Sequence, residues 1–150
     1  MDDVDRNILA ALQKDGRLTV TELAERVRLS LSPCHRRLRA LESSGAISGY
    51  HAHLNAQALG LAFDALVFVT MRDANRDTLA AFEEATADIS HVVQAQRLFG
   101  DPDYLLRIVT KDLAAFQQLY DDRLASLPGV QRLTSTLVMK SIVENRSLPL

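Results

Sequence analysis

The spacing of apolar residues in this 150-residue chain changes near residue 46, and this change constrains the fold more than any other feature. Before residue 46, apolar side chains recur every three or four positions, which is the spacing of amphipathic helices. After it, they first alternate with polar residues, as on half-buried strands. A chain of this length can hold two small domains. The sequence therefore predicts a helical domain at residues 1–54, a linker at 55–60 and a second domain at 61–150.

The first two predicted helices carry recognisable end signals. Helix one follows an N-cap at Asp2 or Asp3 and stops at Gly16. Helix two starts at a capping box, in which the Thr19 hydroxyl and the Glu22 carboxylate each accept a hydrogen bond from a backbone amide. Both helices have apolar residues at helical spacing, so we expect them to pack against a shared core.

The third predicted helix, from Ser30 or Ser32 to about Ser44, has one apolar and one cationic face. Its apolar stripe consists of Cys34, Leu38 and Leu41. On the opposite side lie Ser32, Arg36, Arg39 and Ser43, flanked by His35 and Arg37. Residues 26–41 contain five arginines and no acidic residue, although the whole chain has a net charge of −2. One local surface is therefore positive on a chain that is too acidic to coat nucleic acid everywhere.

Residues 46–54 alternate apolar and polar side chains around Gly49, which predicts a short hairpin. Three helices followed by a hairpin form a winged helix-turn-helix. In such a fold the third helix enters the DNA major groove, where the planar fork of an arginine can bind guanine. We expect Arg36 and Arg39 to contact bases, with phosphate contact as the alternative, and His35 and Arg37 to belong to the same DNA-binding surface. Ser30 and Ser32 either contact phosphates or only cap the helix.

The second domain has the order β-α-β-β-α-β, which is the split arrangement of a ferredoxin-like fold. The predicted strands and helices cover residues 63–71, 79–85, 92–99, 104–109, 113–127 and 133–143. The fold class is therefore α+β. The first strand is apolar on both sides, and two helices can cover only one face of the sheet. We expect a second copy of the chain to cover the other face as a homodimer.

Few residues suit catalysis or metal binding. Cys34, the only cysteine, lies on an apolar stripe and is expected to be a core residue. His51 and His53 are two candidate ligands without a third, so we interpret them as surface residues of the hairpin. No triad spacing or phosphate-binding glycine loop is present, so no enzyme activity, metal or cofactor is expected. The acidic start and the absence of a long apolar run predict a cytoplasmic protein with no membrane partner.

Together, these motifs resemble the Lrp/AsnC, or feast/famine, family of regulators along nearly the full length. The N-terminal markers are residues 5–9, Leu29-Ser30 with Pro33-Cys34, residues 37–42, and Gly45-Ala46-Ile47 before Gly49-Tyr50. The C-terminal markers are residues 100–106, residues 127–130 and Thr134-Ser135-Thr136. The combination is specific, whereas any one marker alone is weak.

The resemblance implies a homodimer that assembles into tetramers or octamers, bends double-stranded DNA and binds an amino-acid effector in clefts between dimers. It places Gly100, Asp101, Thr134 and Thr136 at the effector site, where Asp101 would accept a hydrogen bond from the ligand ammonium. An alternative is that residues 100–103 form only a turn. Phe99 stands where the family usually has a small residue, so we expect it to narrow the site.

The sequence thus predicts a sequence-specific DNA-binding transcriptional regulator modulated by an amino acid. The alternative is an architectural DNA-binding protein of the same fold that ignores small molecules.

Overall fold

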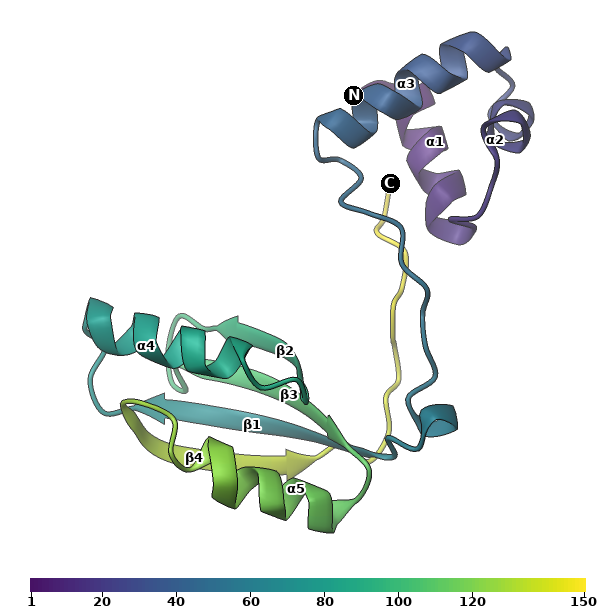
Figure 1. Ribbon diagram of the computed structural model, residues 1–150. Helices are drawn as coiled ribbons and strands as arrows, with labels where there is room; N and C mark the ends of the chain where they lie inside the picture. The colour runs from purple at the N-terminus through teal and green to yellow at the C-terminus, as the bar shows by residue number, and fades with distance from the viewer. The chain divides into compact units, whose positions relative to one another are not determined.

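The computed structural model describes residues 1–150 and divides the chain into two compact units (Figure 1). The first unit is Met1–Leu54 together with Ile142–Leu150, and the second is Asn55–Ser141. The C-terminal residues 142–150 therefore group with the N-terminal helices, although the sequence assigned them to the second domain. The side-chain amide of Gln13 holds them there, since it donates to the Leu148 carbonyl at 3.3 Å and accepts from the Leu148 amide at 2.6 Å.

The first unit is built from α1 (Asp3–Lys14), α2 (Val20–Arg26) and α3 (Leu31–Ser43). Asp2 caps α1, and the predicted capping box of α2 is confirmed, since the Glu22 amide donates to Thr19 Oγ1 at 3.2 Å. The three helices enclose a core of Ile8, Leu9, Ala11, Leu23, Ala24, Cys34, Leu38 and Leu41. Burial raises the pKa of the Cys34 thiol, so this cysteine is an inert core residue as predicted.

The predicted hairpin after α3 is wrong. Residues 46–54 contain no strand, and this part of the chain runs as an extended segment. Ile47 is half-buried against the helical core, whereas Tyr50 and Leu54 are exposed. A two-stranded hairpin is only marginally stable without an apolar surface to bury. Ile47 alone does not provide that surface, and His51 and His53 lie exposed on the extended segment.

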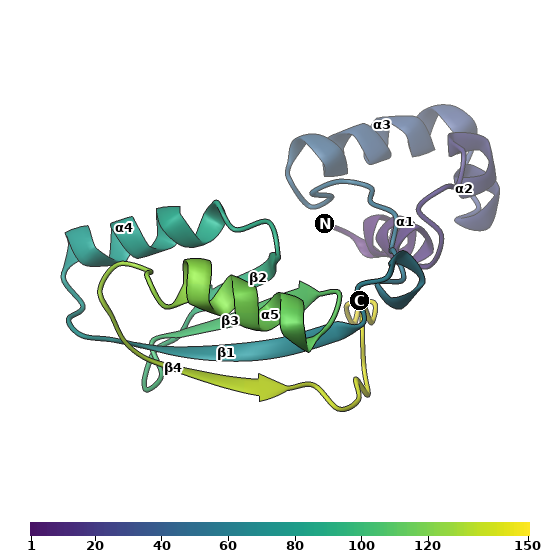
Figure 2. The same cartoon turned by 60° about the horizontal axis from the view of Figure 1, so that its bottom comes forward.

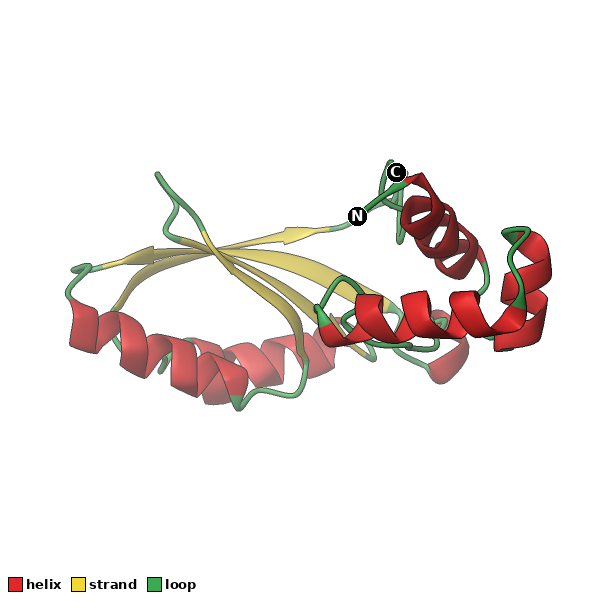
Figure 3. Ribbon diagram, turned by 90° about the horizontal axis from the view of Figure 1, so that it is seen from above, coloured by secondary structure: helices red, strands yellow, loops and turns green.

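The second unit has the predicted β-α-β-β-α-β order. Its elements are β1 (Phe63–Met71), α4 (Arg76–Ala87), β2 (Val92–Arg97), β3 (Tyr104–Thr110), α5 (Leu113–Leu119) and β4 (Val130–Leu137). A short 3-10 turn, η1 (Gln57–Leu59), precedes β1, and a π-helical turn, η2 (Tyr120–Leu124), extends α5. The antiparallel sheet has the order β2-β3-β1-β4, and α4 and α5 cover the same face (Figures 2 and 3). This arrangement confirms the α+β ferredoxin-like fold.

The last strand is shorter at its end than predicted. It pairs with β1 from Val130 to Leu137, and the final ladder bond joins the Val138 amide to the Asp64 carbonyl at 3.1 Å. Because β1 begins at Phe63, it offers no further backbone partner. The apolar residues Met139, Ile142 and Val143, which the sequence placed in the strand, are exposed.

The two faces of the sheet differ in how well they are covered. Ala65, Val67 and Val69 of β1 are fully buried beneath α4 and α5. Leu66 and Phe68 point to the opposite, uncovered face, where β1 pairs Phe68 with Leu105 of β3. We call this surface the open face.

No helix in either unit is long and apolar enough to cross a membrane.

Candidate nucleic-acid interface and ligand site

The outward face of α3 is polar and cationic, as its sequence predicted. Ser32, His35, Arg36 and Arg39 are exposed, whereas Cys34, Leu38 and Leu41 on the inward side are buried. The helix has 13 residues, and a short turn at residues 27–30, in which Arg28 has a φ of 57°, separates it from α2. An exposed helix after such a turn is the element that helix-turn-helix proteins insert into the major groove.

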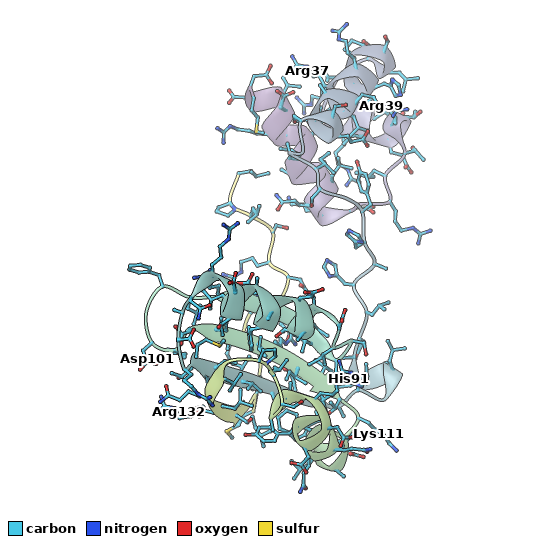
Figure 4. The ribbon with its side chains drawn as sticks, turned by 60° about the vertical axis from the view of Figure 1, so that its left-hand side comes forward. Arg37, Arg39, His91, Asp101, Lys111 and Arg132 are labelled. Carbon is cyan, nitrogen blue, oxygen red and sulfur yellow. The ribbon has the colours of Figure 1, made fainter.

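Neither Arg36 nor Arg39 forms an ion pair or a side-chain hydrogen bond within the chain. All donors of both guanidinium groups are therefore available to an external acceptor. Figure 4 shows Arg39 on α3.

Arg37 forms ion pairs within the chain, which Arg36 and Arg39 do not. Its Nη1 atom lies 2.8 Å from Asp2 Oδ2 and 2.8 Å from Asp5 Oδ1, so it fastens α3 to the start of α1. Hydrogen bonds to the two carboxylates raise the pKa of Arg37, and the Asp5 amide and the Arg37 guanidinium lower the pKa of Asp2. The positive charge of Arg37 is thus compensated inside the first unit. Arg37 therefore joins α3 to the start of α1, and its contact with DNA stays a prediction.

The two serines at the start of α3 are distinguished by their backbone positions. Ser30 is the N-cap residue, but its side chain makes no capping hydrogen bond. Ser32 lies in the first turn and is exposed. The Ser30 hydroxyl therefore does not cap the helix by a side-chain hydrogen bond. The hydroxyls of Ser30 and Ser32 both lie at the N-terminal end of α3, where the helix dipole attracts anions.

The predicted effector loop connects β2 to β3. Gly100 has a φ of 137°, a conformation that favours glycine, and a Cβ there would meet no atom within 4 Å. Asp101 is exposed. Asp103, which the sequence analysis did not single out, anchors the loop, because its Oδ2 accepts the Met71 amide at 2.7 Å and its own amide donates to the Val69 carbonyl at 2.9 Å. No local sequence pattern could have identified this long-range contact.

Thr134 and Thr136 lie on β4, exposed on the open face opposite Phe68 and Leu66. The effector loop precedes β3, and β1 separates β3 from β4 in the sheet. Strands two positions apart are about 9–10 Å from each other. Within one chain, β1 therefore lies between the strand that follows the loop and the two threonines. In Figure 4, Asp101 and Arg132 lie at one end of the second unit, with His91 and Lys111 at the other.

The Phe99 side chain is fully exposed within one chain. Single exposed apolar side chains are common on protein surfaces, so this exposure alone assigns Phe99 no role. The expectation that Phe99 narrows an effector site between dimers stays a prediction.

A hollow of about 390 Å³, which the sequence did not predict, lies between α4 and β2. Glu83 of α4 and Arg97 of β2 stand at its charged end, together with Tyr104. The Tyr104 hydroxyl donates to Glu83 Oε1 at 2.7 Å, and burial, followed by this contact, raises the pKa of Tyr104 to about 12. The tyrosine is therefore a neutral donor at physiological pH. Its residue type alone gave no signal, because the sequence showed it only as the start of a strand.

Comparison with known proteins matches both units to families. Residues 64–148 match the family described as Lrp/AsnC ligand binding domain, and residues 1–48 match the family described as winged helix-turn-helix DNA-binding. The chain is 41% identical over 150 residues to the Bkd operon transcriptional regulator of Pseudomonas aeruginosa, covering 100% of this chain and 98% of the relative. It is 36% identical over 148 residues to the leucine-responsive regulatory protein of Escherichia coli K12, covering 99% of this chain and 90% of that relative.

Solved structures agree with these relatives. A transcriptional regulator from Neisseria meningitidis in complex with L-Met superposes with a TM-score of 0.94 at 40% identity, over 99% of this chain and 96% of that one. An AsnC family transcriptional regulator from Agrobacterium tumefaciens gives a TM-score of 0.93 at 34% identity, over 99% of this chain and 97% of that one.

Proposed function

Since the chain belongs to the Lrp/AsnC family of transcriptional regulators, we propose that α3 reads the DNA sequence and that an amino acid, bound between subunits of an oligomer, modulates this binding. The observation that carries the first part is the contrast among the arginines of α3. Arg36 and Arg39 are exposed and unpaired, whereas Arg37 is held by two carboxylates. If the arginines of α3 were only a solvated surface, all three would be expected to have similar surroundings.

In this proposal Arg36 and Arg39 contact base edges, His35 lies beside them, and the hydroxyls of Ser30 and Ser32 contact phosphates. A bidentate arginine–guanine contact carries sequence information, whereas a phosphate contact positions the helix without reading the sequence. The regulator would act in the cytoplasm, where bacterial DNA lies, and the role requires no catalysis.

Selection of binding sites from random double-stranded DNA tests this part. Wild type should enrich a near-palindromic motif with half-sites about one helical turn apart, or a multiple of that, because a dimer presents two copies of α3. The Arg36→Ala/Arg39→Ala variant should lose the motif, and Arg123→Ala, an exposed arginine of the second unit, should retain it. Enrichment of the same motif by the α3 variant would contradict the proposal.

The proposed dimer forms through the open face. Leu66, Phe68 and Leu105 leave apolar surface there that no element of the same chain covers. Burying such surface is favourable by about 25 cal/mol per Å² removed from water, so a second copy is the simplest cover. Larger assemblies of dimers, as tetramers or octamers, would then bring the loops of neighbouring dimers together.

The proposed effector site lies between dimers because one chain cannot complete it. Gly100 and Asp101 are on the loop, Thr134 and Thr136 are on β4, and the two groups are separated within the chain. A neighbouring subunit can supply the missing half. Support comes from the L-Met complex of the Neisseria meningitidis regulator, which has the same fold at 40% identity.

Calorimetry with the twenty amino acids tests the sensing role. We expect at least one amino acid to bind wild type and Asp101→Ala to weaken that binding, because the ammonium loses its carboxylate partner. DNA affinity of the dimer should persist in the variant. If wild type binds no amino acid, the protein is an architectural DNA-binding protein of the same fold.

A further inference from the structure

The hollow between α4 and β2 contains a buried polar atom that the protein leaves without a partner. Thr86 of α4 is 3% exposed and lines this hollow, and its Oγ1 atom has no hydrogen-bond partner. Leaving a buried hydroxyl unpaired is unfavourable, so such a group calls for an external partner. We call the hollow the α4–β2 pocket.

The walls of the α4–β2 pocket are mainly apolar. Phe82 is almost fully buried and packs its ring against Tyr104 with 4.5 Å between centroids, while Val92, Ala87 and Ala95 complete the walls. A volume of about 390 Å³ is within the range of small-molecule sites, which combine apolar walls with a few polar groups.

Opposite charges stand together at one end of this pocket. Arg97 Nη1 and Glu83 Oε1 are 3.9 Å apart, near the limit of an ion pair, and both side chains are more than half exposed. The contact is loose, but Glu83 Oε1 also accepts the Tyr104 hydroxyl at 2.7 Å, so the capacity left for a ligand lies at Glu83 Oε2 and the Arg97 guanidinium. A guanidinium beside a carboxylate matches a ligand that carries a carboxylate and an ammonium next to each other.

We infer that the α4–β2 pocket binds a small α-amino acid, with the ligand carboxylate on Arg97, its ammonium on Glu83 and its side chain along Phe82 and Val92. The ligand also supplies a polar partner for Thr86. This site lies within one subunit and differs from the loop site of Gly100 and Asp101. The inference rests on the proposed sensing function, because it gives that function a second place to bind its effector.

Calorimetric titration of the full-length protein with each of the twenty L-amino acids tests this inference. We expect Arg97→Gln to weaken binding at this site about tenfold or more, because a charge-assisted hydrogen bond is lost. Thr86→Val, which keeps the shape of the side chain, should weaken it about threefold. Arg123→Gln, an exposed arginine outside the pocket, and Asp101→Ala should leave this binding unchanged.

The same titrations separate the two sites. If an amino acid binds Arg97→Gln and Thr86→Val as tightly as wild type and only Asp101→Ala loses it, the α4–β2 pocket is not the site, and the sensing function stands. If Arg97→Gln loses a ligand that Asp101→Ala retains, the pocket is confirmed as a site of its own. If wild type binds no amino acid, both this inference and the sensing role fail, while DNA binding by α3 is unaffected.

Discussion

Neighbouring residues of α3 have different roles because a helix places successive side chains on different faces. Arg36 and Arg39 point outward, and Arg37 turns toward α1, where Asp2 and Asp5 neutralise it. The sequence identified the cationic face correctly. It could not separate Arg37 from the others, because its partners are more than 30 positions away along the chain.

Replacing Arg37 tests this division of roles. Arg37→Ala should lower the melting temperature, because it removes two ion pairs between α1 and α3, and the folded variant should retain the DNA sequence preference of wild type. The pKa of Asp2 is lowered in the folded state. The ion pair of Asp2 therefore contributes its full stabilisation when the pH is above 3.8, the pKa in the unfolded chain. This stabilisation is lost as the pH falls through the lower pKa of the folded state.

The difference in melting temperature between wild type and Arg37→Ala should therefore narrow below pH 3.8. Thermal unfolding followed by circular dichroism at several pH values measures it. A difference that stays constant into the acid range would show that the ion pairs do not stabilise the fold.

Thr86 provides a prediction on stability. Thr86→Val should raise the unfolding free energy by about 1 kcal/mol in the absence of ligand, because it removes a buried hydroxyl without a partner and keeps the volume of the side chain. Urea denaturation measures the change. Lower stability in Thr86→Val would mean that the hydroxyl has a partner in the folded protein.

At the scale of elements, the predictions that succeeded had local signals. The capping box at Thr19 and Glu22 fixed the start of α2, and the apolar run of β1 gave its two ends, Phe63 and Met71. Two predictions were wrong: residues 46–54 form an extended segment and not a hairpin, and β4 ends before the predicted residue 143. Both depend on whether a partner strand or an apolar surface is present, and local spacing does not contain that information.

The turn before β4 requires glycine at position 129, both for its backbone conformation and for lack of space. Gly129 has a φ of 69°, and a Cβ there would overlap Thr78 Cγ2 of α4. Gly129→Ala should destabilise the protein by about 3 kcal/mol, the sum of left-handed strain and overpacking. Gly60→Ala is the matched control, since Gly60 has a φ of 78° with no atom within 4 Å of the added Cβ.

The control should lose only about 1 kcal/mol, the cost of the left-handed conformation. Urea unfolding of both variants provides the comparison. Equal losses of unfolding free energy in the two variants would show that crowding between residue 129 and α4 does not contribute.

At the scale of the whole molecule, the open face is the proposed dimer interface. The sequence predicted it from the two-sided apolar pattern of β1, and the structure shows Leu66 and Phe68 on the face that no helix covers. The proposed effector site was harder to predict, because its loop and β4 lie far apart in the sequence and the proposal joins them only across subunits. Residue types and a family resemblance could suggest its parts but not their placement.

A charged residue at the centre of the open face should break the dimer. Phe68→Asp would place a carboxylate in the proposed apolar interface, and burying an unpaired charge is strongly unfavourable. We expect sedimentation equilibrium at micromolar concentration to give dimers or larger species for wild type and monomers for the variant. Leu113→Asp, an exposed leucine on α5, is the control. A dimeric Phe68→Asp would place the interface elsewhere.

The most direct test of DNA reading by α3 is the ratio of affinities for a selected site and for a scrambled site. Fluorescence anisotropy at several salt concentrations measures this ratio for wild type and for single alanine variants. Arg36→Ala and Arg39→Ala should each reduce the difference in binding free energy between the two sites by about 1–3 kcal/mol, because a base contact is lost. Arg26, at the end of α2, and Arg28, in the turn before α3, are exposed and are expected to contact phosphates. Arg26→Ala and Arg28→Ala should therefore weaken binding to both sites equally and lower the salt slope by about one. An unchanged ratio in both α3 variants would contradict the account.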